Sequence, residues 1–359
     1  MSIWGPSSST PSSPAVAAEA SAARARALGT NTLLVLLLVA AMLAALTIGQ
    51  YPLGPGAALR LVLARIAGLP GDAGTTAELV VFQVRLPRML AAVLVGAALA
   101  AAGSAYQGLF RNPLVSPDIL GVSAGAGLGA VFGIFLSLPV VAIQLLAFAV
   151  GIATVALVYA IASAVRGREP ALVLVLAGVV VGTLAGSTIS LIKILADPYD
   201  QLPAITFWLL GSLAGATGAD IRGAAPLVLL GLVPMVLLRW RMNVMSLGDE
   251  EAQALGVDAR RIRRVLVLAA TLMTAAVVAI GGIIGWVGLI VPHVARMLVG
   301  PDFARLLPAA MLLGALYLLC VDTLARTLAT TEVPLGILTA FLGAPFFLWL
   351  LARGRHAWS

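Results

Sequence analysis

The sequence predicts an all-α polytopic membrane protein with about ten transmembrane helices. Apolar residues make up 61% of the 359 positions and charged residues 10%, whereas soluble domains average about 45–50% and about 25%. The mean hydropathy of +1.07 is too high for a soluble core, because a folded chain must still cover itself with polar groups. Apolar runs of about 20 residues, the length of a membrane helix, recur along the chain. These observations exclude a soluble enzyme, a nucleic-acid binder and a disordered scaffold.

Charges, prolines and glycines divide the chain into ten predicted spans. Residues 1–29 precede them; this segment is rich in Ser, Pro and Ala, lacks an apolar core, and is expected to be a disordered tail. Residues 30–355 are expected to form the membrane domain. The eighth span is short, so we expect it to be tilted, broken or partly buried by its neighbours. The spans are predicted at 31–50, 86–106, 118–136, 140–163, 171–194, 223–240, 264–282, 285–299, 305–324 and 335–352.

Basic residues predict the orientation of the spans. The net charge of +7 is attributed to Lys and Arg in cytoplasmic loops, which membrane proteins favour. If the N-terminus is cytoplasmic, 15 of the 22 basic residues lie on the cytoplasmic side, and an even number of spans places both termini there. The seven basic residues predicted outside are Arg60, Arg65, Arg85, Arg88, Lys193, Arg222 and Arg326.

The motifs of catalysis and metal binding are missing from the sequence. The single lysine, Lys193, is followed by Ile194, so no phosphate-binding loop of the G-x-x-x-x-G-K-[ST] type exists and another chain must bind any ATP. No H-E-x-x-H, C-x-x-C or carboxylate cluster indicates a metal site. His293 has no second ligand nearby in sequence, so a structural role is favoured over ligation. We therefore expect neither a cofactor nor a metal.

A glycine stripe marks the third predicted span. Gly121, Gly125, Gly129 and Gly133 recur every four residues and therefore share one helix face. Small residues at this spacing let two helices approach closely in lipid, so packing is the favoured role. Ser123 lies within a G-x-S-x-G sequence, but a hydrolase elbow needs a strand, a turn and a histidine partner.

The longest polar interruption after the tail covers residues 247–264, LGDEEAQALGVDARRIRR, on the predicted cytoplasmic side. Acidic residues come first and arginines last, the order that suits a helix dipole. Gly256 is expected to divide the segment into two short helices. A solvated loop is the alternative interpretation, but a docking surface is favoured, because the segment holds the apolar anchors Ala252, Leu255, Val257 and Ile262.

The segment 51–84 is also long and lies on the predicted outer side. Its apolar spacing predicts a short amphipathic helix that carries Arg60 and Arg65. Such a helix can rest at the interface with its arginines on lipid phosphates. It can equally offer a basic landing surface to an acidic soluble partner, and composition does not choose between the two.

Three stretches resemble the signatures of one family. Residues 85–131, which include NPLVSPDILGVSAGAG, resemble permeases for iron-siderophore, haem and vitamin B12 uptake. Residues 281–302, GGIIGWVGLIVPHVARMLVGPD, and residues 332–351, EVPLGILTAFLGAPFFLWLL, are similar to the family's later motifs. The resemblance implies the permease of a type II ATP-binding-cassette importer in a bacterial inner membrane. It further implies a second permease copy, two ATPase subunits and a periplasmic binding protein as partners.

The resemblance also implies functional residues. Residues 247–264 fall where the family has its coupling helices, and Ala252 and Leu255 are expected to enter an ATPase cleft. The outer arginines Arg60, Arg65 and Arg326 are the expected contacts of the binding protein. The full set expected for ATPase coupling is Glu251, Ala252, Leu255, Gly256, Val257 and Asp258.

Residues 211–217, GSLAGAT, and the ending GAPFFLWLL look most like haem and siderophore permeases. Haem is therefore the expected substrate, with a ferric siderophore second and cobalamin third, carried without a tight site in the permease. An ion-coupled secondary transporter is the rival from another class, but it needs titratable residues inside the membrane. An intramembrane hydrolase that uses Ser123 is the rival enzyme.

Overall fold

The computed structural model describes residues 14–49, 51–68, 75–165, 170–329 and 331–353. Throughout these ranges the secondary structure is helical, without a β-strand. Each of the ten predicted spans overlaps at least one helix, which confirms the all-α membrane fold. The helices are α1 (Pro14–Thr47), α2 (Pro55–Ile66), α3 (Thr76–Leu79), η1 (Val80–Arg85), α4 (Leu86–Leu109), η2 (Pro117–Leu120), α5 (Val122–Phe135), α6 (Val140–Ala164), α7 (Pro170–Leu195), α8 (Gln201–Leu210), α9 (Gly218–Leu237), α10 (Arg239–Met245), α11 (Asp249–Ala254), α12 (Ala259–Gly281), α13 (Val287–Val299), α14 (Phe303–Ala325) and α15 (Leu335–Arg353).

The helices differ in their capacity to cross a membrane. Within the described part of the chain, seven helical stretches are long and apolar enough to do so. The third, eighth and tenth predicted spans correspond to the shorter apolar helices α5, α13 and α15. A fourth short apolar helix, α8, was not predicted, because its ten residues are too few to read as a span.

The first helix corrects the expected tail. α1 begins at Pro14, so residues 14–29 are helical rather than disordered, whereas residues 1–13 lie outside the described residues. The physical reason is composition, because Ala, Glu and Arg dominate this stretch and all three favour helix. Pro14 fits the first turn, where its missing N–H costs nothing.

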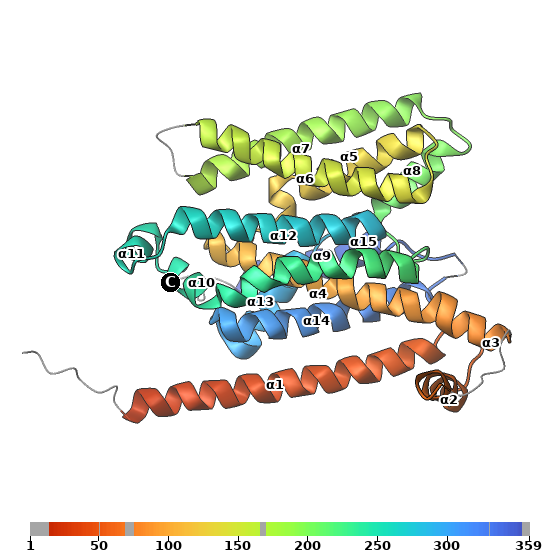
Figure 1. Cartoon of the computed structure of the whole chain (residues 1–359), viewed down its shortest axis with the longest axis horizontal. Helices are drawn as coiled ribbons and strands as arrows, with labels where there is room; N and C mark the ends of the chain where they lie inside the picture. The colour runs from red at the N-terminus through yellow and green to blue at the C-terminus, as the bar shows by residue number, and fades with distance from the viewer. Residues whose placement is uncertain (1–13, 50, 69–74, 166–169, 330, 354–359) are drawn as a thin grey trace, which may run out of the picture.

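The helices lie roughly parallel, with α4 at the centre (Figure 1). α1 lies along one edge, and α5, α6 and α7 lie along the opposite edge. α4 makes its most extensive contact with α14, where Gly96 and Gly314 meet so closely that a Cβ on either would overlap the other's carbonyl. A Cβ on Gly103 would likewise overlap the carbonyl of Gly288 on α13, whereas a Cβ on Gly288 would meet the carbonyl of Leu99. Small residues therefore permit the close packing of this core.

The glycine stripe of α5 faces α6. A Cβ on Gly125 would overlap Thr154, and one on Gly129 would overlap the carbonyl of Leu146. A Cβ on Gly133 would meet Ile143. Gly121 caps the start of α5 in a left-handed conformation, with φ of 78°. The glycines of α5 therefore form its contact surface with α6.

The two polar surfaces expected from the sequence lie at opposite ends of the bundle. α2 and α3 lie at one end, and α10 and α11 lie at the other (Figure 1). α12 begins at the α11 end and runs back through the bundle, so the surface around α11 joins directly onto a buried helix.

Candidate functional site

The candidate site is the surface formed by α11 and the start of α12, which we call the coupling surface (Glu251, Leu255, Gly256, Asp258 and the residues around them). α11 ends in a Schellman motif, in which Gly256 donates its N–H to the carbonyl of Gln253 at 2.9 Å and Val257 donates to Ala252 at 2.8 Å. Gly256 has φ of 77°, which favours glycine. The sequence therefore stops α11 by a specific capping motif.

α12 starts immediately after this motif. Asp258 is its N-cap, and one carboxylate oxygen accepts the backbone N–H of Arg261 at 3.0 Å. The C-terminal cap of α11, at Gly256 and Val257, is followed directly by the N-cap of α12, at Asp258. This short connection fixes the angle between the two helices. The predicted division at Gly256 is correct, but the second helix is not short, since it continues for 23 residues.

A partly buried ion pair holds α11 against α12. One terminal nitrogen of Arg263 lies 2.8 and 3.0 Å from the two carboxylate oxygens of Asp249. The Arg263 side chain is 6% exposed, so its charge depends on this partner. Because Asp249 begins α11, the pair ties the first turn of α11 to the second turn of α12.

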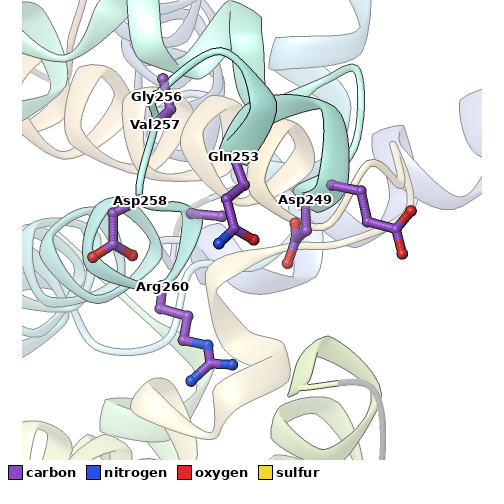
Figure 2. A pocket seen from close by; sticks show the side chains of 8 residues that line it. Asp249, Gln253, Gly256, Val257, Asp258 and Arg260 are labelled. Atoms are coloured by element: carbon purple, nitrogen blue, oxygen red, sulfur yellow. The ribbon is translucent and has the colours of Figure 1, made fainter.

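An open cavity of about 740 Å³ lies on the coupling surface. In Figure 2, Gln253 stands between Asp249 and Asp258, and the polar ends of all three side chains point to the same side. Glu250 and Arg260 also line the cavity. With three carboxylates and one guanidinium, the cavity is acidic and complements a partner with basic and hydrogen-bonding groups.

The structure separates the expected coupling residues into two groups. Glu251, Gly256 and Asp258 are exposed, and the Leu255 side chain is 57% exposed although it is apolar. Ala252 and Val257 are buried inside the subunit. The expectation that Ala252 enters a partner's cleft is therefore wrong, because it packs against Val257 as the hydrophobic contact of the Schellman motif. Leu255 is the apolar side chain left to dock.

The outer arginines also differ from one another. Arg60 is exposed on α2, with its Nε 3.3 Å from the carbonyl of Gly56. Arg65 is exposed, lies 3.6 Å from Glu78 and stacks over the ring of Phe82. Both side chains are accessible from solution. A binding-protein contact for them stays a prediction.

Arg326 is not an accessible docking residue. Its side chain is 12% exposed and lies 3.5 Å from Asp322, which has no exposed surface. Arg88 contacts the same carboxylate at 2.9 Å and Glu332 at 2.5 Å. Arg326 instead belongs to a cluster of charged side chains, defined here as Arg88, Asp322, Arg326 and Glu332, in which Glu332 is the exposed member.

The cluster was missed because its members are far apart in the sequence. Arg85 lies beside it and donates to the carbonyls of Leu46 and Tyr51 at 2.6 and 2.5 Å, which secures the end of α1. Arg85 and Arg88 both follow the outer loop, as headgroup anchors would, so sequence position alone suggests lipid contacts. Only the fold brings Asp322 within reach of Arg88.

The remaining polar candidates form no reactive site. The Ser123 hydroxyl bonds to the carboxylate of Asp118, and His356 lies outside the described residues. Among the residues that the structure describes, no three His, Cys, Asp or Glu side chains gather closely enough to hold a metal. His293 is half-buried on α13.

Comparisons with known proteins identify the family. Residues 36–353 match the FecCD transport family. The chain belongs to this family. It is 43% identical to the cobalamin import system permease protein BtuC of Halobacterium salinarum, over 81% of this chain and 78% of that one. It is 42% identical to the hemin transport system permease protein HmuU of Yersinia pestis, over 76% and 83%.

A third relative is named for a different substrate. The molybdate import system permease protein MolB of Haemophilus influenzae is 40% identical, over 89% of this chain and 95% of that one. A solved structure described as an inward-facing metal-chelate type ABC transporter matches with a TM-score of 0.81 and 38% identity, over 90% and 98%. The solved structure shows the same fold, and the relatives differ in named cargo.

Proposed function

We propose that this chain is the permease subunit of an ATP-binding-cassette importer that moves an iron chelate into the cytoplasm. Haem is the favoured substrate. It performs no catalysis itself, since partner ATPase subunits bind and hydrolyse ATP. The observation that carries the proposal is the coupling surface, a capped and ion-paired structure that joins directly onto the buried helix α12. Family membership supports the transport role independently.

The coupling surface suits the transmission of force. Asp249 and Arg263 connect α11 to α12, and α12 packs against α4, α6 and α9. Movement of a partner seated at Leu255 would therefore displace several helices together. The acidic cavity beside Leu255 supplies hydrogen-bond acceptors for that partner.

The exposed face of α7 supports a second permease copy around a shared path. Thr183, Ser187 and Ser190 are exposed on this apolar helix, as is Gly186. Thr183 and Ser190 donate their hydroxyls to carbonyls one turn earlier, at 2.8 and 3.0 Å. Such a face offers small groups and few free donors, which fits a path that passes its substrate without gripping it.

The membrane arrangement follows from the same proposal. The predicted membrane domain, residues 30–355, lies in a bacterial inner membrane, with both termini and the coupling surface in the cytoplasm. α2 then faces the periplasm, where Arg60 and Arg65 meet the acidic surface of a binding protein. The position of α2 and α11 at opposite ends of the bundle supports this orientation (Figure 1).

Haem is proposed as the first substrate because residues 211–217 and 343–351 resemble haem and siderophore permeases. The named cargoes of the relatives, which include cobalamin, hemin and molybdate, support the wider class of metal chelates and oxyanions. An ion-coupled transporter is disfavoured because the charged cluster around Asp322 lies near the helix ends and is paired internally.

Co-expression with a candidate ATPase and a candidate binding protein tests the function. We expect the three proteins to co-purify, and binding-protein-dependent ATPase activity to rise with haem or a ferric siderophore. Cobalamin and molybdate serve as matched alternatives in the same assay. An ATPase that fails to co-purify, or uptake that follows a proton gradient and ignores ATP, would contradict the proposal.

A further inference from the structure

A second cavity, of about 360 Å³, lies between α6 and α12. Its lining is almost wholly apolar and includes Val155, Ala156, Val267 and Leu268. Ala156 is exposed and Leu268 is 65% exposed, so the cavity is a groove open to the outside of the bundle. α6 and α12 lie side by side along it (Figure 1).

The groove has one charged end. Arg264 lines it near the start of α12, and Thr271 lines it seven residues further on. At 1.5 Å per residue these positions are about 10 Å apart along the helix. Tyr159 lines the groove from α6. Arg264 is exposed and makes no hydrogen bond or ion pair within the described part of the chain.

The surroundings of the groove select its occupant. Both helices are long and apolar enough to cross a membrane, so the apolar part of the groove faces the bilayer interior. Arg264 lies in the second turn of α12, at the end that carries the coupling surface. Arg263 is paired with Asp249. Among the described residues, the Arg264 guanidinium is therefore an unpaired cation at one end of the apolar groove.

We propose that the groove binds one anionic phospholipid of the cytoplasmic leaflet. One acyl chain lies between α6 and α12, and the phosphate accepts hydrogen bonds from the Arg264 guanidinium. Anionic lipid headgroups attract basic side chains at the membrane surface, and the acyl chain adds apolar contacts with the groove. The lipid thereby braces the first turns of α12, beside the pair that holds α11.

Native mass spectrometry of the delipidated full-length chain, titrated with phosphatidylglycerol, tests the proposal. We expect one lipid to bind more tightly than phosphatidylcholine of the same acyl chains. Arg264→Gln should weaken phosphatidylglycerol binding about fivefold, the effect of one basic residue at an anionic surface. Arg261→Gln removes the same charge three residues earlier, outside the groove, and should leave binding unchanged.

A second variant tests the acyl-chain part. Ala156→Trp fills the groove and should abolish the single tight lipid. Equal affinity in Arg264→Gln and Arg261→Gln, or a tight lipid retained by Ala156→Trp, would overturn the proposal. Ala160 also lines the groove on α6, and Cys320 is the single cysteine of the sequence. A disulfide between two copies through Ala160→Cys, in a Cys320→Ser background, would show that a second subunit covers the groove and would also overturn the proposal.

Discussion

The Nε hydrogen of Arg88 is shared by both carboxylate oxygens of Asp322, at 2.9 and 3.1 Å, although the two residues are 234 positions apart. The pair joins the first turn of α4 to the last turn of α14. Asp322 has no exposed surface and the Arg88 side chain is 6% exposed. Water therefore cannot solvate either charge in place of its partner. The pair therefore fixes the end of the bundle that we assign to the periplasm.

Asp322→Asn should lower the free energy of unfolding by about 3 kcal/mol, the cost of removing one partner from a buried ion pair. Unfolding of the purified chain in mixed micelles measures the loss. Glu332→Gln is the matched control, because Glu332 is 39% exposed and its removal should cost less. A loss below about 1 kcal/mol for Asp322→Asn, the size of a surface pair, would show that the cluster is not structural.

Leu255→Asp should weaken ATPase binding more than 100-fold, because a desolvated carboxylate without a partner costs about 3 kcal/mol or more. The unfolding free energy of the permease should not change, since Leu255 is exposed in the free subunit. Val257→Asp should instead lower the unfolding free energy of the permease itself, because Val257 is buried. Surface plasmon resonance and unfolding measurements distinguish the two. Normal ATPase affinity in Leu255→Asp would place docking elsewhere.

Gly256→Ala should destabilise the end of α11 by about 1 kcal/mol, because a residue with a Cβ is strained in the left-handed region. Space is not the cause, since no atom lies within 4 Å of a Cβ built there. Gly223→Ala is the matched control, with equal space and ordinary helical backbone, and should be neutral or stabilising. Hydrogen exchange of residues 249–258 measures the local effect. Equal protection in both variants would refute the capping role.

Gly129→Leu should disrupt folding, because its side chain would collide with the carbonyl of Leu146 on α6. Gly186→Leu should leave the isolated subunit folded, because nothing lies within 4 Å of that position on α7. If α7 faces a second copy and the path, Gly186→Leu should still reduce transport. Size-exclusion chromatography and uptake assays test the two outcomes, and a folded Gly129→Leu chain would count against the packing role.

Charge reversal of Arg60 and Arg65 together should slow association with the binding protein and weaken its salt dependence, because rim charges act mainly on encounter. Arg326→Glu should instead destabilise the chain, since it places a second acid beside Asp322. Stopped-flow association at several salt concentrations measures the first effect. Unchanged rates in the double reversal would remove α2 from the docking surface.

The sequence predicted the features that repeat or that act locally. Ten apolar runs indicated the helices, four glycines indicated a face for close helix packing, and Gly256 indicated a break, because each depends on neighbouring positions. Ala252 and Leu255 could not be told apart, since both are apolar and only the Schellman motif turns one inward. Arg88 and Asp322 could not be paired, because their contact is made by the packing of α4 on α14.

ATP-dependent uptake into proteoliposomes tests the central claim most directly. The vesicles contain the permease with its ATPase, and the binding protein is supplied outside with radiolabelled iron chelate. The wild-type chain should accumulate the label only with ATP, whereas Leu255→Asp should accumulate none while remaining folded. Uptake by Leu255→Asp at the wild-type rate, or uptake by the wild-type chain without ATP, would contradict the account.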